Sequence, residues 1–277
     1  MDLTSAIRED VERALAEDIG TGDLTASLVP ASEQAHARVV TREPAVLSGI
    51  AWFEECFHQI DRDVEIRWNA RDGDRLASKR VVCEIGGRAR SLLTAERSSL
   101  NFLQTLSAVA TKTRAFVDAV AGTKAAILDT RKTLPGLRHA LKYAVRCGGG
   151  TNHRMGLYDG VLIKENHIAS AGGIRSALTQ ARQIAPDVAV EIEVESIAQL
   201  KEAIAAGAKL ILLDNFNLAG FREAVRVTAG RAALEASGGI NLETVRAIAE
   251  TGVDRISVGS LTKDIRAVDL SMRFVAA

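Results

Sequence analysis

Short apolar runs alternate with longer amphipathic segments from about residue 125 onward. The short runs predict strands at 125–130, 160–166, 188–196, 209–215, 232–239 and 255–260. Between them, helical spacing predicts helices at 197–206 and 242–251, with Asn241 as an N-cap and Gly207 and Gly252 at the C-terminal ends. Repeated strand–helix units with apolar strands predict a parallel sheet covered by helices. The number of units fits a closed or nearly closed α/β barrel better than an open sheet, although the pattern alone does not decide between them.

The part of the chain before about residue 100 has a different pattern. A helix is predicted at residues 2–17, followed by a turn-rich link, "DIGTGDLT". The segments that follow predict a smaller α+β domain with strands and an intervening helix, at 35–41, 64–70 and 80–87 for the strands and 54–60 for the helix. A long helix at 95–120 joins the two parts.

Composition excludes several classes of protein. The 277 residues are 47% hydrophobic, which is enough for a sizeable core, and Lys+Arg and Asp+Glu are both 35, so net charge does not indicate nucleic acid or an anionic membrane. Three widely spaced cysteines, Cys56, Cys83 and Cys147, indicate neither a disulfide framework nor a zinc site. No apolar run approaches the ~20 residues of a membrane span, and the acidic first segment lacks the apolar centre of a signal peptide. We therefore expect a cytoplasmic protein.

Charge is nevertheless concentrated in one segment. Residues 131–167 hold seven Lys or Arg against Asp159 and Glu165, and three of the five histidines, His139, His153 and His167. The seven cations are Arg131, Lys132, Arg138, Lys142, Arg146, Arg154 and Lys164. A local cationic zone in a neutral protein indicates a small anionic ligand rather than a polyanion.

Polar or glycine residues follow nearly every predicted strand of the barrel, and the loops after the strands form the binding face of such a barrel. These groups are 129–131, 164–166, 193–196, 214–215, 237–239 and 259–260. Each has a simpler interpretation, because charged loop residues are usually solvated and the segment "RCGGGTNHR" can be a flexible connector. Together they indicate one site, with His153 and Arg154 beside a glycine run that lets backbone approach a ligand closely.

Acidic residues complete the predicted site. Alternation along "EIEVE" places Glu191, Glu193 and Glu195 on one strand face, which is either solvent-facing or, inside a barrel, in need of cations, metal or water. Asp214 ends the next strand, near enough to share a Mg²⁺ ion with Glu193. The turns "ASGGI" and "SVGSL" close two successive strands before expected helices and are typical of phosphate-binding loops.

The segment "DTRKTLPGLRHALKYAVRCGGGTNHRMGLYDGVLIKENH", residues 129–167, resembles the signature of the quinolinate phosphoribosyltransferases, also called nicotinate-nucleotide pyrophosphorylases (carboxylating). Further matching pieces run along the chain: "EDIGTGDLT", "ERSSLNFLQTLS", "VEIEVES", "ILLDNF", "EASGGI" and "ISVGSLT". The resemblance implies an α/β protein with an N-terminal open-faced α/β sandwich and a C-terminal incomplete, TIM-like α/β barrel. We place these at 1–110 and 111–277, with an N-terminal helix that can pack on the barrel.

The same resemblance implies the reaction of quinolinate with phosphoribosyl pyrophosphate, giving nicotinate mononucleotide, pyrophosphate and CO2. It implies a homodimer or larger homo-oligomer with shared sites, no nucleic-acid or membrane partner, and Mg²⁺. Arg97, from the partner subunit, would hold the quinolinate carboxylates with Arg131, His153, Arg154 and Lys164. Phosphoribosyl pyrophosphate and its Mg²⁺ would contact Lys132, Glu193 and Asp214, and the 5′-phosphate would contact Ser237, Gly238, Gly239, Val258, Gly259 and Ser260. Thr133 would also bind substrate. The catalytic residues would be Lys132, Lys164, Glu193 and Asp214, with Glu193 and Asp214 at the metal.

One position departs from the family pattern, because many relatives have Asn where this chain has Gly239. Glycine keeps the backbone donors that a phosphate needs. Two alternatives stay open from the sequence: a relative linked to molybdate transport that shares the fold, and a non-catalytic barrel that binds a sugar phosphate. Nucleic-acid binding is disfavoured, because the chain shows neither an extended basic face nor a recognised motif.

Overall fold

The computed structural model of the chain describes residues 3–275, which form two compact units. The first unit contains the described residues up to Arg114, Thr133–Gly149, and the described residues from Leu261 onward. The second contains Ala115–Lys132 and Gly150–Ser260. Neither unit is one continuous stretch of chain, because the polypeptide returns twice from the second unit to the first.

The first unit is built on a four-stranded antiparallel sheet in the order β12-β1-β5-β3. Its strands are β12 (Leu270–Val275), β1 (Gln34–Thr41), β5 (Val81–Arg88) and β3 (Glu65–Trp68). A short ribbon pairs β2 (Ala45–Val46) with β4 (Arg75–Leu76). The helical elements are α1 (Thr4–Ile19), the 3-10 turn η1 (Ala26–Leu28), α2 (Ile50–Ile60), α3 (Ala89–Ala119, which continues into the second unit) and α4 (Arg138–Cys147).

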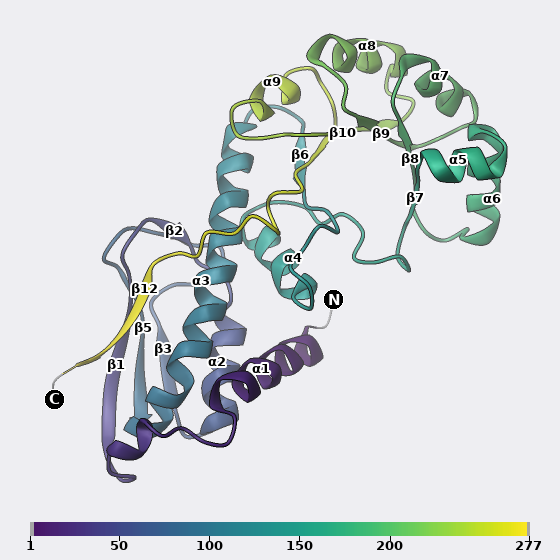
Figure 1. Cartoon of the computed structure of the whole chain (residues 1–277). Helices are drawn as coiled ribbons and strands as arrows, with labels where there is room; N and C mark the ends of the chain where they lie inside the picture. Colours follow the sequence, from purple (N-terminus) through teal and green to yellow (C-terminus); the bar gives the residue numbers. More distant parts are fainter. Residues whose placement is uncertain (1–2, 276–277) are drawn as a thin grey trace. The chain divides into compact units, whose positions relative to one another are not determined.

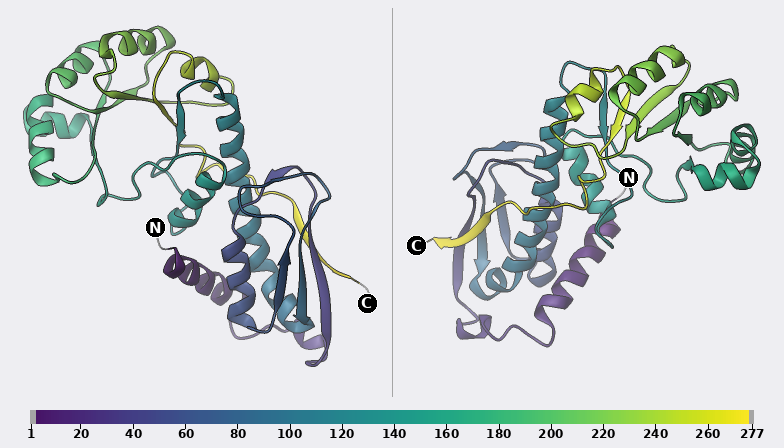
Figure 2. Two further views of the ribbon diagram at one scale, coloured as in Figure 1. Left: turned by 180° about the vertical axis from the view of Figure 1, so that it is seen from behind. Right: turned by 45° about the horizontal axis from the view of Figure 1, so that its top comes forward.

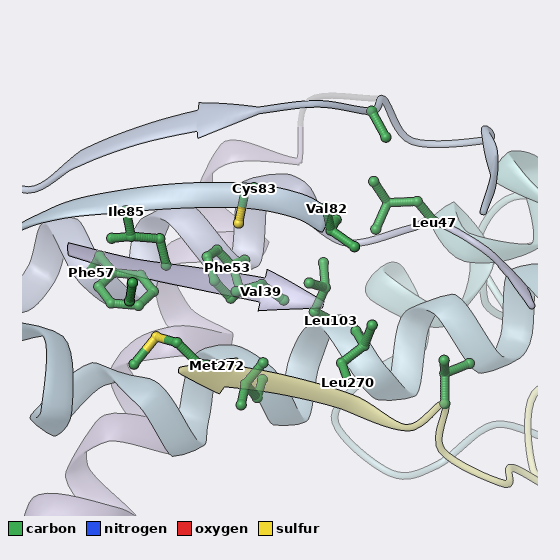
Figure 3. Packing of buried hydrophobic residues seen from close by; sticks show 14 of the residues in the cluster. Val39, Leu47, Phe53, Phe57, Val82, Cys83, Ile85, Leu103, Leu270 and Met272 are labelled. Atoms are coloured by element: carbon green, nitrogen blue, oxygen red, sulfur yellow. The ribbon is translucent and has the colours of Figure 1, made fainter. Parts of the chain in front are cut away.

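Side-chain alternation explains why helices cover only one face of this sheet. Val39 of β1 and Ile85 of β5 are buried against Phe53 and Phe57 of α2 and Leu103 of α3, as Figure 3 shows. On the alternate positions, Arg38 and Arg67 both pair with Glu84 across the sheet, and all three side chains are partly or largely exposed. A sheet with one apolar and one charged face is the open-faced sandwich that the sequence predicts.

Helix α1 begins two residues later than the helix predicted at 2–17, and residue 2 lies outside the described part of the chain. Its residues Val11 and Leu15 share a core cluster with Trp52 of α2 and with Ala140 and Leu141 of α4. Helix α4 falls within 111–277, the stretch predicted to form the barrel, yet α1, α2 and α4 all lie in the first compact unit.

The second unit is a six-stranded parallel sheet in the order β6-β11-β10-β9-β8-β7. Its strands are β6 (Ala126–Leu128), β11 (Arg255–Ser257), β10 (Ala233–Ser237), β9 (Leu210–Asp214), β8 (Val190–Val194) and β7 (Val161–Ile163). The sheet curves strongly, with helices on its outer side (Figures 1 and 2). These helices are α5 (Glu165–Ala171), α6 (Ile174–Ile184), α7 (Ile197–Ala205), α8 (Leu218–Thr228) and α9 (Val245–Ala249). The predicted α/β fold class, with an incomplete barrel, is confirmed.

The edge strands β6 and β7 are the two ends of the curved sheet. After α4 the chain passes beside β6 again, where Thr151 bridges to Leu128, and continues to β7, where the N–H of Val161 donates to the carbonyl of Ala189. This segment, 151–160, is therefore tied to both edge regions of the incomplete barrel and carries His153 and Arg154 with it.

Two features of the fold differ from the expectations drawn from the sequence. The last strand, β12, pairs with β1 in the register Thr41↔Leu270, so residues assigned to the barrel complete the N-terminal sheet. Helix α4 lies in the first unit although it separates β6 from β7. The division at residue 110 treated each domain as continuous, whereas the compact units are interleaved along the chain. None of the described helices has the length and apolar character to cross a membrane.

Candidate active site

A cavity of about 170 Å³ lies at the carboxyl ends of the barrel strands. Seven of the predicted site residues line it: Arg131, Lys132, His153, Arg154, Lys164, Glu193 and Ser237. Thr130, Leu162, Leu212, Glu235 and Ser257 complete the wall. Since parallel strands end at the same edge of a sheet, side chains that are distant in sequence converge here.

Cations form one side of this cavity. Arg131 and Lys132 lie in the loop after β6, where the hydroxyl of Thr130 accepts the backbone N–H of Lys132 at 3.0 Å. Arg154 comes from the segment between the edge strands and donates from Nη1 to the carbonyl of Gly160 at 3.0 Å. Burial and the charge of Arg131 lower the pKa of the Arg154 guanidinium from its ordinary value. A guanidinium group whose charge is disfavoured by a neighbouring guanidinium favours an anionic ligand.

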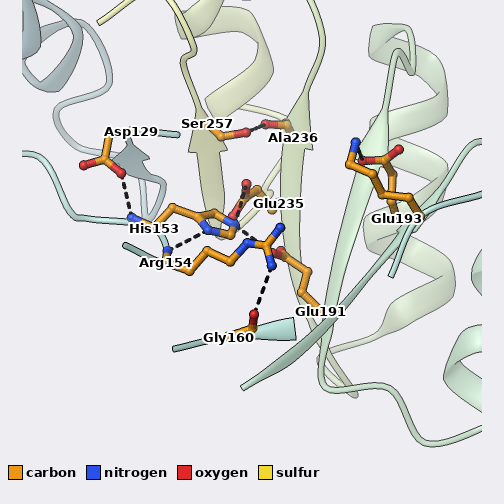
Figure 4. A network of polar contacts seen from close by, with 10 residues as sticks. Asp129, His153, Arg154, Gly160, Glu191, Glu193, Glu235, Ala236 and Ser257 are labelled. Atoms are coloured by element: carbon orange, nitrogen blue, oxygen red, sulfur yellow. Dashed lines mark hydrogen bonds and ion pairs between the residues drawn. The ribbon is translucent and has the colours of Figure 1, made fainter. Parts of the chain in front are cut away.

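Asp129 holds the segment that carries Arg154. Its side chain is fully buried and accepts hydrogen bonds from the backbone N–H of His153 at 2.9 Å and from Nδ2 of Asn152 at 2.5 Å. A buried carboxylate that receives backbone and side-chain donors fixes the position of those donors strongly. Asp129 therefore ties the carboxyl end of β6 to the loop that enters the cavity (Figure 4).

His153 turns both ring nitrogens toward protein groups. The backbone N–H of Arg154 donates to Nδ1 at 2.7 Å, and Nε2 lies 2.8 Å from Oε2 of Glu191. Because Nδ1 must offer a lone pair to the amide, the proton of the neutral ring resides on Nε2 and is donated to Glu191. The resemblance assigned His153 to the quinolinate carboxylates, but both of its nitrogens are engaged within the barrel (Figure 4).

Lys164 and Glu193 form an ion pair across neighbouring strand ends, with Nζ 3.0 Å from Oε2. The Lys164 side chain is 48% exposed and that of Glu193 only 10%, so the carboxylate is the anchored partner. Asp214 ends β9 and accepts a hydrogen bond from Nδ2 of Asn215 at 2.8 Å. It is not among the residues that line the cavity.

The glycine turn after β10 is sterically required. Gly238 has φ +105°, and a Cβ there would lie 2.3 Å from Oδ1 of Asn215. Gly239 also has a positive φ, +57°, and a Cβ there would meet open space. The turn keeps backbone donors accessible beside Ser237, as the phosphate-loop prediction requires.

The second predicted phosphate turn differs from expectation. A Cβ on Gly259 would lie 3.1 Å from Cδ of Lys132, so this glycine gives the Lys132 side chain its space. The residues that follow β11, 259–263, form turns and not the expected helix, so this turn does not lead into a helix N-terminus of its own. Val258 is buried and its N–H donates to the carbonyl of Leu128, which removes it as a phosphate donor.

The remaining predicted residues are not among those that line this cavity. Arg97 is exposed on α3 in the first unit, and Thr133, also in that unit, accepts a hydrogen bond from Nε of Arg138 at 3.3 Å. The predicted residues that do not line the cavity are Arg97, Thr133, Asp214, Gly238, Gly239, Val258, Gly259 and Ser260.

Two buried acids were missed as site residues. Glu191 is 5% exposed and Glu235 is 1% exposed, and both face His153 inside the barrel. Glu191 was part of the predicted acidic face but received no role, and Glu235 received none although it stands alone in the apolar run "AALEAS". An isolated acid in a buried strand is the signal that could have identified it.

The side chains predicted to bind Mg²⁺ can be compared with the ligands that this ion prefers. Glu193 and Asp214 offer the hard carboxylate oxygens that Mg²⁺ prefers, and Glu193 is already partnered by Lys164. Those donors fit a metal that arrives with a phosphorylated substrate and keeps some of its water. Among the described residues, His153, Glu191 and Glu235 are the group whose potential ligand atoms all lie within 4.8 Å of one another. The proton on Nε2 of His153 leaves that nitrogen as a donor and not as a metal ligand.

Comparison with known proteins identifies the family. Residues 109–273 match the family model described as quinolinate phosphoribosyl transferase, C-terminal domain, and residues 23–107 match the N-terminal domain of the same family. The chain belongs to the quinolinate phosphoribosyltransferase family. The sequence-based identification of the family and enzyme class is confirmed.

Individual members of the family match along nearly the whole chain. A probable nicotinate-nucleotide pyrophosphorylase (carboxylating) of Bacillus subtilis is 45% identical, over 92% of this chain and 89% of its own length. The enzyme of that name from Mycobacterium leprae is 44% identical over 96% of both chains. The solved nicotinate-nucleotide pyrophosphorylase of Francisella tularensis superimposes with a TM-score of 0.97 at 45% identity, covering 99% of this chain and 98% of that one.

Proposed function

We propose that the chain transfers the phosphoribosyl group of phosphoribosyl pyrophosphate to quinolinate, with loss of CO2, to give nicotinate mononucleotide and pyrophosphate in NAD biosynthesis. The observation that carries this proposal is the pair of neighbouring guanidinium groups, Arg131 and Arg154, in a cavity that also holds Lys132 and Lys164. Quinolinate is a planar aromatic ring with two adjacent carboxylates. Planar guanidinium groups bind carboxylates through paired hydrogen bonds, which compact ammonium groups do not form.

The two arginines would bind and orient this substrate. Arg131 projects from the end of β6, and Arg154 is fixed through Asp129 and the backbone of His153. As the dicarboxylate enters, its charge relieves the mutual repulsion of the guanidinium groups while water leaves. The apolar side chains of Leu162 and Leu212 in the same wall suit the aromatic ring.

Lys132 and the glycine turns would serve the phosphates. The side chain of Lys132 lies against Gly259, which places its charge beside the turn after β11. Developing charge on a departing pyrophosphate is stabilised by such a positioned cation. Mg²⁺, held through Glu193 and Asp214, would supply further charge neutralisation on the same leaving group.

The chemical step needs no side-chain nucleophile. The pyridine nitrogen attacks C1′ of the ribose as the bond to pyrophosphate breaks, and the transition state resembles the oxocarbenium ion of glycoside cleavage. The carboxylate next to the ring nitrogen then leaves as CO2, because the positively charged ring accepts the electrons of the broken bond. Lys164, held by Glu193 and about half exposed, is the candidate to donate the proton that replaces the carboxylate.

The decisive test is product formation. The purified protein is incubated with quinolinate, phosphoribosyl pyrophosphate and Mg²⁺, and nicotinate mononucleotide and CO2 are measured. A relative with another substrate, such as the pyrophosphorylase linked to molybdate transport, would yield no nicotinate mononucleotide. A non-catalytic barrel would bind sugar phosphate and form no product at all, and either result would refute the proposal.

We further propose that Arg97 reaches the site of a partner subunit in a homodimer. Arg97 is exposed on α3 and is the second residue of the family motif "ERSSLNFLQTLS", which is remote in sequence from the cavity residues. Mixing inactive Arg97→Ala with inactive Lys164→Ala subunits should restore part of the activity, since hybrid dimers contain one site with both residues intact. Absence of recovery after demonstrated subunit exchange would contradict a shared site.

A cytoplasmic location is also proposed. All three cysteines are free thiols, which is usual in reducing compartments. Cell fractionation followed by detection of the protein would test this assignment, and recovery outside the cytoplasmic fraction would refute it.

A further inference from the structure

The barrel interior beneath the cavity contains a buried group of one histidine and two carboxyl groups. Oε1 of Glu235 lies 3.8 Å from Nε2 of His153, and the same nitrogen lies 2.8 Å from Glu191. The three come from β8, β10 and the segment between the edge strands (Figure 4). Two adjacent ionised carboxylates in an apolar surrounding would disfavour each other strongly.

Hydrogen bonding distinguishes the two carboxyl groups. Oε2 of Glu191 accepts the proton that the tautomer of His153 directs toward it, so Glu191 acts as the carboxylate. Among the described residues, neither oxygen of Glu235 has a hydrogen-bond partner, and Oε1 of Glu191 has none either. The hydroxyl of Ser257 lies on the neighbouring strand but is directed at the carbonyl of Ala236, at 3.4 Å. A proton on Glu235 that is directed at Oε1 of Glu191 would give a partner to that oxygen and to one of the two oxygens of Glu235.

We propose that Glu235 is a positioning residue that retains a proton and so limits the floor of the quinolinate cavity to one negative charge. This inference rests on the proposed function for the identity of the ligand. With Glu235 neutral, Glu191 orients His153, whose Nδ1 receives the N–H of Arg154 and thereby holds the backbone of that arginine. If Glu235 ionises, a second buried negative charge lies below a site that must receive a dianion.

The electrostatic surroundings give the direction of the pH effect. Burial, and next the charge of Glu191, raise the pKa of Glu235 to about 7, while a positive charge on His153 or on Arg255 acts in the opposite direction. On β9 the residue in register is the uncharged Leu212, and on β11 it is Arg255. The other charged groups that line the same cavity are Arg131, Lys132, Arg154, Lys164 and Glu193. Quinolinate is a dianion at neutral and alkaline pH, so its affinity should fall as pH rises through the range in which Glu235 loses its proton.

Calorimetric titration with quinolinate at several pH values from 6 to about 8.5 tests the binding effect without requiring turnover. We expect the dissociation constant of the wild-type protein for quinolinate to rise about tenfold across this range, the order of magnitude expected for one added negative charge near an anionic ligand. Glu235→Gln keeps the shape of the neutral acid and removes the titration, so its affinity should be independent of pH. Glu202→Gln, on an exposed position of α7, is the matched control and should follow the wild type.

Infrared spectroscopy of the wild-type protein is a second measurement, and it does not depend on whether Glu235→Gln folds. The carbonyl band of a buried protonated carboxylic acid should be present at pH 6 and lost near pH 7–8, and saturating quinolinate should move this loss upward by about one pH unit because the coupling is reciprocal. The proposal is overturned if no such band titrates, or if Glu235→Gln keeps the wild-type pH dependence of binding. Absence of turnover alongside a normal infrared titration would instead refute the proposed reaction and leave the protonated Glu235 standing.

Discussion

Asp129 offers the sharpest test of how this site is positioned. Its fully buried carboxylate accepts the backbone N–H of His153 at 2.9 Å and Nδ2 of Asn152 at 2.5 Å. Asp129→Asn is nearly isosteric but turns one acceptor oxygen into an NH2 donor. One of these donors then faces the new NH2 group, so the loop that carries Arg154 must shift or lose a hydrogen bond.

The size of the effect follows from these contacts. A hydrogen bond to a charged acceptor contributes about 1.5–3 kcal/mol, and a buried donor left unsatisfied costs about 1–3 kcal/mol. A loss of about 2 kcal/mol at the loop, expressed in substrate binding, corresponds to a roughly 30-fold lower kcat/KM for quinolinate. The loss should appear mainly in the KM for quinolinate, because Arg154 is proposed to hold the substrate and not to take part in bond breaking.

Steady-state kinetics with quinolinate, together with urea unfolding, measure both consequences. The matched control is Asp254→Asn in the same unit, since Asp254 accepts the backbone N–H of Leu234 at 2.8 Å and Nζ of Lys124 at 2.7 Å. The control should lower the free energy of unfolding and leave the KM for quinolinate unchanged. The reasoning is refuted if Asp129→Asn retains the wild-type kcat/KM, or if both variants raise KM equally.

Three further predictions concern the site and the first unit. Arg131→Ala should lower kcat/KM for quinolinate by an amount equivalent to about 2–5 kcal/mol of transition-state stabilisation. Arg131→Lys should recover only part of the lost activity. Wild-type activity of the lysine variant in steady-state assays would contradict paired guanidinium binding. Gly238 has φ +105°, and a Cβ there would meet Oδ1 of Asn215 at 2.3 Å. Gly238→Ala should therefore lower the free energy of unfolding by about 1–3 kcal/mol and raise the KM for phosphoribosyl pyrophosphate. Wild-type values in both thermal unfolding and kinetics would contradict this prediction. Hydrogen bonds from Arg88 hold the pKa of Asp61 well below its usual range, so this carboxylate stabilises the fold above the unfolded pKa of about 3.9 and loses that contribution as pH falls toward the folded value. Asp61→Asn should therefore cost on the order of 2 kcal/mol at pH 7 and progressively less in strong acid, and a pH-independent difference in urea unfolding would exclude this account.

The fold was predictable wherever a local pattern determines an element. Strands of the barrel were found because each is a short apolar run, although their predicted ends were too long. Lys164, for example, continues the run "GVLIKEN" in sequence but precedes α5, and a polar residue at that point is equally compatible with a strand end or a helix N-cap. Strand β12 joins the sheet of the first unit, and sequence does not show this because its partner, β1, lies more than two hundred residues earlier. Alternation shows that 270–275 can be a strand and does not show which sheet it joins.

The site residues, too, were predictable where local sequence determines their position and were not predictable where contacts distant in sequence determine it. Arg131, Lys132 and Lys164 were predictable because each follows an apolar strand, and parallel topology then brings strand ends together. The contacts of His153 were not predictable, since its ring nitrogens are engaged by the backbone amide of Arg154 and by Glu191, which is 38 residues away. Glu235 is a single acid in an apolar strand, and its importance depends on the side chain that the curvature of the sheet brings opposite it. Sequence thus indicates which charged side chains a barrel offers to its ligand. The protonation state of those side chains depends on contacts that form only when the sheet has folded and curved.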